Sequence, residues 1–312
     1  MIIFNLSSYN PYILMGIPGL EQFHVWIGIP FCIIYIMAIM GNCILFYLIA
    51  VEHSLHEPMF FLSMLAMMDL ILSTTTVPKV LSIFWLGVQE ITFPGYLTQM
   101  FFLHYSTALD SVILMDMAFD RYVAICSPLR YTTILTPKTI IKIVVGLAFR
   151  RFCIILPVVF LLTCLPFCRT RIIPDTYREH IGVARHTSAD ISINIWLGFC
   201  VTFMTVISDV ILIGVSYTLI LCAVFRLPSQ DSHQKALCTC GSHVCVILMF
   251  YTPASFSILA HHFGHNISHT FHILFANLYI VIPPALNPIV YGVKTKQIRD
   301  KVILLFSAKG ME

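Results

Sequence analysis

The residues of this chain best able to do chemistry are polar side chains that interrupt long apolar stretches. Asn42 and Asp69 each lie in such a stretch, and Asn287 begins the run NPIVYG near the end of another. A polar or charged group in an apolar environment is costly and marks an ion site, a proton path or a contact between helices. We expect these three residues to converge as one polar cluster that binds a cation or water and rearranges between conformations. The alternative is a static hydrogen-bond network joining three helices.

A second polar group lies at residues 115–131, MDMAFDRYVAICSPLRY, where Asp116, Asp120 and Arg121 stand among apolar side chains. On a helix, Asp120 and Arg121 would lie where the apolar stretch ends. A charge pair at such an interface contributes little stability but serves as a latch, because Arg121 can pair with Asp120 in one state and leave it in another. The alternative is an arginine that extends to the membrane edge without a switching role.

The composition indicates which elements must position these residues. Of the 312 residues, 58% are hydrophobic and 11% are charged, and the mean hydropathy is +0.88. A soluble domain would carry about a quarter charged residues, so most of this chain is expected to lie in lipid. Apolar runs long enough to cross a bilayer predict seven spans, at about 25–51, 58–86, 93–126, 139–165, 191–226, 236–260 and 273–293. The fourth is the weakest, because Arg150 and Arg151 lie near its middle.

The predicted fold is therefore an all-α membrane protein, a seven-transmembrane helix bundle with a short C-terminal interfacial helix. We expect an outer tail at 1–24, the bundle at 25–293 and an inner tail at 294–312, in which Ile298, Val302 and Leu305 share the apolar side of an amphipathic helix. Lysines and arginines gather in the short loops on one side, which predicts an outer N-terminus and a cytoplasmic C-terminus. With no signal peptide apparent, the first span would start insertion. Asn5 is then a glycosylation acceptor.

Several motifs, in order and at consistent spacing over about 280 residues, resemble an olfactory receptor. They are GN at 41–42, HEPMFFLSMLAMMDL, DRYVAIC followed by SPLRY, KALCTCGSHVCVILMFYTP and NPIVYG. The stretches GIPGLE, FSILAHHFGHNI and ANLYIVIPPALNPIVYGVKTKQIRDKV are most similar to the class I (fish-like) receptors of family 52. The resemblance implies a rhodopsin-like G-protein-coupled receptor in the plasma membrane, which binds odorants and signals through the olfactory stimulatory G protein to cAMP.

The resemblance also implies an activation switch. The latch at the inner end of the third span would be Asp120, Arg121 and Tyr122, which Tyr217 and Tyr291 would meet when the sixth helix swings outward. The opened inner cleft would receive the C-terminal helix of the G protein. Independently of the resemblance, prolines inside the sixth and seventh spans are candidate hinges, because proline removes a helical hydrogen bond. The alternative is that membrane helices tolerate these prolines and nothing moves there.

Class I receptors often recognise carboxylic acids, and the resemblance places the odorant pocket between the third, fifth and sixth spans. The expected lining residues are His104, Ala108, Leu109, Thr202, Thr205, Tyr251, Ser255, Ile258 and Leu259. The alternative is that these side chains only pack between helices. In the family an arginine in "HRFGH" suits a carboxylate through two charged hydrogen bonds. Here His262 occupies that position, so we expect weaker carboxylate binding that strengthens in acid. The alternative is that His262 is a solvated residue at a loop end.

The chain departs from the family in its outer cysteines. Olfactory receptors normally tie the outer end of the third helix to the long outer loop by a disulfide, with a second bridge within the loop. Here Tyr96 and Arg178 stand at two of the cysteine positions, the segment 186–190 lacks a third, and Cys168 remains. Because a lost disulfide typically costs about 2–5 kcal/mol, a second hypothesis is a poorly folding, weakly or non-signalling receptor-like product.

Other classes of function are less well supported by the sequence. A transporter or channel would show paired repeats with broken helices, and none is apparent. No catalytic motif stands out, so we expect no enzyme and no cofactor. His261, His265 and His269 have helical spacing, but Gly264 and Asn266 favour a turn, so we expect no metal site. The net charge of +3 gives no nucleic-acid footprint; lipid, odorant and G protein are the expected partners.

Overall fold

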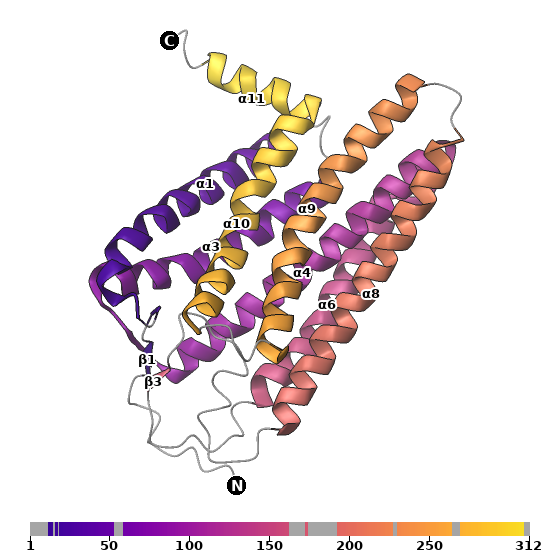
Figure 1. The fold of residues 1–312 in the computed structure, drawn as a ribbon. Helices are drawn as coiled ribbons and strands as arrows, with labels where there is room; N and C mark the ends of the chain where they lie inside the picture. The colour runs from indigo at the N-terminus through magenta and orange to yellow at the C-terminus, as the bar shows by residue number, and fades with distance from the viewer. Residues whose placement is uncertain are drawn as a thin grey trace.

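The computed structural model of the chain describes residues 12–14, 16–17, 19–52, 59–161, 172–173, 192–226, 230–263 and 269–308. Within these ranges, seven helices of 25 residues or more run side by side as one bundle (Figure 1). They are α1 (His24–Val51), α3 (Phe60–Leu86), α4 (Phe93–Cys126), α6 (Pro137–Leu161), α8 (Ser192–Val224), α9 (Gln230–Phe263) and α10 (His269–Lys294). Each corresponds to one predicted span, so the predicted all-α bundle is confirmed.

The central helix of the bundle is α4, which packs against α3, α6, α8 and α9, while α10 packs between α1 and α9. Five of the seven are long and apolar enough to cross a membrane by composition alone; α4 and α9 are not among them. The shortfall of α4 has a clear cause, since Asp110, Asp116 and Asp120 interrupt it. All three side chains are buried, so they face other helices and leave the outer surface of the bundle apolar.

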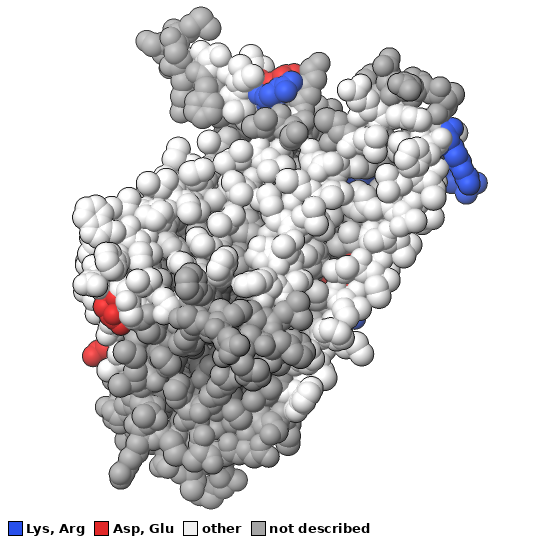
Figure 2. All heavy atoms as spheres, in the orientation of Figure 1, with Lys and Arg blue, Asp and Glu red and all other residues white. Residues whose placement is uncertain are grey.

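The outer surface of the bundle is hydrophobic. Trp26, Phe149 and Met204 are exposed by 71%, 68% and 69%, respectively. Figure 2 shows one face of the molecule almost without charged atoms between its two ends. In water such a surface would be an aggregation hazard, whereas in a bilayer it is the expected lipid contact.

A small sheet, which the sequence did not predict, closes the end of the bundle near the N-terminus. The strand β1 (Tyr12–Leu14) pairs antiparallel with β2 (Glu90–Ile91) and parallel with β3 (Ile172–Ile173). The Nζ atom of Lys79 donates to the carbonyls of Val88 and Glu90, at 2.9 Å each. Backbone pairing therefore joins the N-terminal strand β1 to residues 90–91 on one side and to residues 172–173 on the other.

The turn that carries β2 is set by local sequence. The helix α3 ends at Gly87, whose φ of 64° lies in the left-handed region that glycine adopts without strain. The next long helix begins after Thr92, whose hydroxyl accepts from the backbone N–H of Gly95 at 3.3 Å. Together these caps fix the C-terminal end of α3 and the N-terminal end of α4.

The opposite end of the bundle carries the short helix α11 (Lys296–Ala308) (Figure 1). Its apolar side faces the bundle, because Ile298 is 1% exposed and Val302 packs against the core. An ion pair between Lys301 Nζ and Glu52 Oε2, at 2.5 Å, connects α11 to the end of α1. The neighbouring Ile303 and Leu304 are exposed by 55% and 61%. The described residues also include the short helices η2 (Glu21–Phe23), η3 (Pro128–Arg130) and α5 (Tyr131–Ile134).

Candidate functional site

The first polar site lies between α1, α3, α4 and α10. The amide of Asn287 donates to both carboxylate oxygens of Asp69, at 3.3 and 3.0 Å. The amide of Asn42 donates to the backbone carbonyl of Pro284 at 2.8 Å. That carbonyl lacks its usual helical donor, because residue 288, four positions on, is a proline without an N–H. All three predicted residues therefore act on the same stretch of α10.

Sequence reasoning missed the fourth member of this site, Asp110 of α4. It is 2% exposed, and its Oδ1 atom has no hydrogen-bond partner among the described residues. Asp69, Asp110 and Asn287 line one small cavity, with room for about one water molecule. The rule applied to Asp69, that an acid within a span is a functional candidate, would also have found Asp110. We call Asn42, Asp69, Asp110 and Asn287 the Asp69 cluster.

The approach of α1 to α10 beside this cluster requires a glycine. A Cβ atom on Gly41 would lie 2.7 Å from Cγ of Pro288. The Gly-Asn pair at 41–42 thus serves α10 in two ways. Gly41 lets α1 contact α10, and Asn42 donates to the Pro284 carbonyl that Pro288 leaves without a helical donor.

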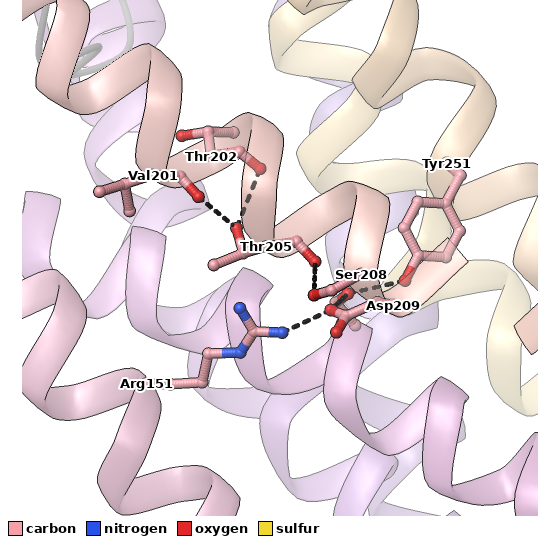
Figure 3. Close-up of polar contacts among 8 residues, drawn as sticks. Arg151, Val201, Thr202, Thr205, Ser208, Asp209 and Tyr251 are labelled. Carbon is pink, nitrogen blue, oxygen red and sulfur yellow. Dashed lines mark hydrogen bonds and ion pairs between the residues drawn. The ribbon is translucent and has the colours of Figure 1, made fainter. Parts of the chain in front are cut away.

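The second polar site joins four helices at mid-bundle (Figure 3). An ion pair connects Arg151 Nη2 of α6 to Asp209 Oδ2 of α8, at 2.5 Å. The same oxygen accepts from the hydroxyl of Ser111 on α4. Ser111 is also within 2.7 Å of the Tyr251 hydroxyl on α9. We call these four residues the Asp209 network.

Every member of the Asp209 network is buried, with exposures between 3% for Arg151 and 7% for Tyr251. From the sequence alone, Arg151 is only a weakness of the fourth span, and Asp209 does not stand out. The available signal was one acid and one base in separate spans, because opposite charges in a membrane interior usually pair. Arg150, by contrast, is exposed on α6.

The third site is the C-terminal end of α4. Arg121 Nε lies 3.9 Å from Asp120 Oδ2, so the two charges are in contact but not tightly bonded. The hydroxyl of Tyr131, a residue not predicted, donates to Asp120 Oδ1 at 2.8 Å. Tyr217 on α8 is bonded instead to Nδ1 of His243 on α9, at 2.6 Å.

The remaining switch residues are packed rather than paired with the arginine. The hydroxyl of Tyr291 is buried without a hydrogen-bond partner in the described part of the chain. Tyr122 and Tyr217 pack around Ile220, Val224 and Cys240. The structure thus brings Asp120 and Arg121 together and leaves Tyr217 and Tyr291 outside that pair.

The residues expected to line an odorant pocket are only partly gathered. Leu109 and Tyr251 share one hydrophobic cluster of the core, and Ala108 packs against another. His104 is partly buried, whereas Thr202 and Ser255 are exposed. The hydroxyl of Thr205 bonds to its own helix, at 2.8 Å from the carbonyl of Val201. The side chains of Ile258, Leu259 and His262 lie outside the described residues, as does Asn5.

Tyr96 lies in the first turn of α4, at a position where the resemblance led us to expect a disulfide cysteine. Its side chain is 1% exposed and packs in a cluster with Leu14 and Ile17. Cys168, Arg178 and residues 186–190 lie outside the described part of the chain. Among the described residues, no group of three His, Cys, Asp or Glu side chains could hold a metal ion.

Comparisons with known proteins agree with this architecture. A sequence model described as olfactory receptor matches residues 31–309. Human olfactory receptor 52H1 is 83% identical over 310 residues, covering 98% of this chain and 99% of that protein. Human olfactory receptor 52B2 is 60% identical over 301 residues, covering 96% and 93%. Human olfactory receptor 52B6 is 55% identical over 301 residues, covering 95% and 90%.

Proposed function

Since the chain belongs to the olfactory receptor family, we propose that it is an odorant receptor for small volatile or carboxylic-acid-type ligands, which signals through the olfactory stimulatory G protein to cAMP. Membership makes it a multi-pass receptor of the plasma membrane, with an odorant and a G protein as partners, and excludes an enzyme. The ligand class, the type of G protein and the second messenger are our proposal.

The observation that best supports a coupling between a bound odorant and movement of α9 is the Asp209 network. Tyr251 lies two residues before Pro253 of α9, and its hydroxyl is bonded to Ser111 on the central helix. An odorant beside Tyr251 would change the free energy of that bond, and with it the position of α9. A ligand needs only to bind the rearranged state better than this one, and the population then shifts.

At the inner end, we propose that the bond between Tyr217 and His243 holds α9 against α8 in the resting state. Outward movement of α9 would break this bond and free Tyr217 to approach Arg121 together with Tyr291. Arg121 is poorly held by Asp120 at 3.9 Å, which favours its release. The cleft opened in this way would admit a helix of the G protein.

The Asp69 cluster has a separate proposed role, the binding of a cation or water that is released or moved on activation. Two buried acids face one small cavity, and one of their oxygens has no partner among the described residues. A cation in this cavity would offset the negative charge of the ionised carboxylates, which the neutral amide of Asn287 cannot do.

For the orientation, we propose an outer N-terminus and a cytoplasmic C-terminus. The strand β1 lies at one end of the bundle and α11 at the other (Figure 1). The basic residues Arg121, Arg130 and Lys301 lie toward the α11 end (Figure 1), which the positive-inside rule assigns to the cytoplasm.

The second candidate is a receptor-like product that folds poorly because the outer disulfide is missing. Tyr96 in place of a cysteine favours it. The three-stranded sheet and the bonds of Lys79 favour folding, because they join the same outer segments without a covalent link.

One experiment separates the two candidates. Cells would express the full chain with an N-terminal tag, beside Tyr96→Cys with Arg178→Cys, and surface staining and cAMP would be recorded for short carboxylic acids and the matching alcohols. A receptor for acids gives surface staining and a cAMP response to acids in the unaltered chain, stronger at pH 6 than at pH 7.4 if His262 binds the carboxylate. Staining of the cysteine variant alone would support the poorly folding product.

A further inference from the structure

The two adjacent arginines of α6 have opposite environments, and one of them lacks a counter-charge. Arg151 is 3% exposed and paired with Asp209. Arg150 is exposed, and no ion pair or hydrogen bond joins it to any residue that the structure describes. It therefore projects from the side of the bundle that faces lipid.

The depth of Arg150 makes this costly. It lies 12 residues from Lys138 and 11 from Leu161, or about 18 and 16 Å along the helix. The hydrocarbon core of a bilayer is about 30 Å thick, so the Cα atom of Arg150 is near the middle. An arginine there is rare unless it reaches water, an interface or an anion.

The surface below Arg150 offers a route to an anion. Side chains of a helix lean toward its N-terminus, so Arg150 leans toward Gly146, one turn away and about 40° round the helix. Lys142 lies two turns away and about 80° round from Arg150. A Cβ atom on Gly146 would meet nothing within 4 Å, so the helix surface is open here; we call the space left by the missing side chain the notch. Lys138 and Lys142 are both exposed below the notch.

The rest of this face suits lipid tails. Ile141, Val145 and Phe149 are exposed by 52%, 60% and 68%, and they flank the cationic residues. Residues 137–161 contain no Asp or Glu, so nothing on α6 offsets the three exposed cations. An apolar ridge beside a row of positive charges is complementary to an amphiphile with an anionic head group.

We propose that Lys138, Lys142, Gly146 and Arg150 form a binding site for an anionic phospholipid of the cytoplasmic leaflet. Arg150 binds the phosphodiester at the notch, where two guanidinium N–H groups can donate to phosphate oxygens. The two lysines bind a second anionic group further from the bilayer centre, such as a serine carboxylate or an inositol phosphate. The acyl chains lie along Val145 and Phe149, and local thinning of the leaflet brings the head group within reach.

This site rests on the proposed orientation, which puts the N-terminal end of α6 at the cytoplasmic side. Glycosylation of Asn5 tests the orientation separately, so failure of the lipid site and failure of the orientation are distinguishable. The odorant-binding function is not needed for the site.

The test is a lipid competition on the purified full-length receptor, read by native mass spectrometry and in nanodiscs. Phosphatidylserine and a phosphoinositide would each compete with phosphatidylcholine. We expect the unaltered receptor to retain the anionic lipids and Arg150→Gln or Lys142→Gln to lower the preference by about fivefold for each charge. Gly146→Leu, which fills the notch and keeps every charge, should also lower it.

Two matched controls keep the result specific. Gly214 lies on α8 in equally open space, so Gly214→Leu should leave the preference unchanged. Arg226→Gln removes an exposed arginine beyond the end of the same helix and should also leave it unchanged. Equal preference for all lipids in the unaltered receptor, or equal loss in the controls, would overturn the proposal. A third outcome would also overturn the proposal. If Arg150→Gln converts a dimer to a monomer and leaves the lipid preference unchanged, the counter-charge of Arg150 comes from a second copy of the chain.

Discussion

The Asp209 network and the Asp69 cluster are both buried and polar, but their charge balance differs. In the Asp209 network, the carboxylate has an arginine partner at 2.5 Å and links to α4 and α9 through two hydroxyl groups. In the Asp69 cluster, the amide of Asn287 donates to Asp69 alone, and both acids line one small cavity. The first pairs an acid with a base and connects helices, whereas the second holds two acids with no basic partner among the described residues and a cavity beside them. A paired network transmits movement, and acids beside a cavity are suited to an exchangeable ion or water.

The largest effect is expected when the Asp209 network loses one of its charges. Arg151→Ala leaves Asp209 buried and unpaired, and breaking a buried pair in this way costs about 3–5 kcal/mol. Replacing both partners, as in Arg151→Met with Asp209→Leu, should restore much of the loss because no charge is stranded. Thermal unfolding of the purified receptor and surface staining measure both. If Arg151→Ala were as stable as the unaltered chain, the ion pair would not hold α6 to α8.

The second effect acts on the Asp69 cluster through packing alone. Gly41→Ala places a methyl group 2.7 Å from Cγ of Pro288, next to Asn287. Because a proline ring cannot turn aside, we expect destabilisation of about 1–3 kcal/mol. Gly214→Ala, where the added carbon meets nothing within 4 Å, is the control and should be neutral or slightly stabilising. Equal melting temperatures for both variants would show that α1 is free to shift from α10.

The fold was predictable because each span is an apolar run of about 20 residues or more. A single segment of that length crosses a bilayer as a helix. The strand β1 was not predictable, since three residues paired to two short loops have no periodic signal of their own. Of the Asp69 cluster, three members were expected, and Asp110 was missed although the same rule covers it. The latch of Asp120 and Arg121 was expected from their place at the end of an apolar stretch, whereas the roles of Tyr217 and Tyr291 came from the family resemblance. The bond between Tyr217 and His243 depends on the relative position of α8 and α9.

The Asp209 network was missed for a physical reason. Its members lie on four helices, 40 or more positions apart along the chain, and side-chain spacing along one helix says nothing about pairs between helices. The neighbouring Arg150 and Arg151 illustrate the limit further. Their adjacent positions turn them about 100° apart on the helix, enough to put one inside the bundle and one outside, but the sequence alone does not say which.

A smaller effect is expected from removing one hydroxyl of the Asp209 network. Tyr251→Phe abolishes the bond to Ser111 and keeps the ring, so it should cost about 1 kcal/mol in this conformation. If that bond restrains α9, the change raises basal cAMP about fivefold at unchanged surface staining. Repeating it in a Ser111→Ala background tests the coupling, because a bond already lost cannot be lost again. An equal rise in both backgrounds would place the action of Tyr251 elsewhere.

The smallest effect should come from the ion proposed for the Asp69 cluster. A cation that binds only the folded receptor stabilises it by about 0.4 kcal/mol when its concentration equals its Kd. We therefore expect sodium chloride to raise the melting temperature slightly above that in choline chloride at equal ionic strength. Asp69→Asn, which keeps the size of the side chain and removes its charge, should abolish this difference. The paired variant Arg151→Met with Asp209→Leu should keep it, because the Asp209 network has no unmatched charge to offer. A sodium effect that survives Asp69→Asn, or one absent from the unaltered receptor, would leave the cavity to water alone and make the Asp69 cluster a fixed link between α3 and α10.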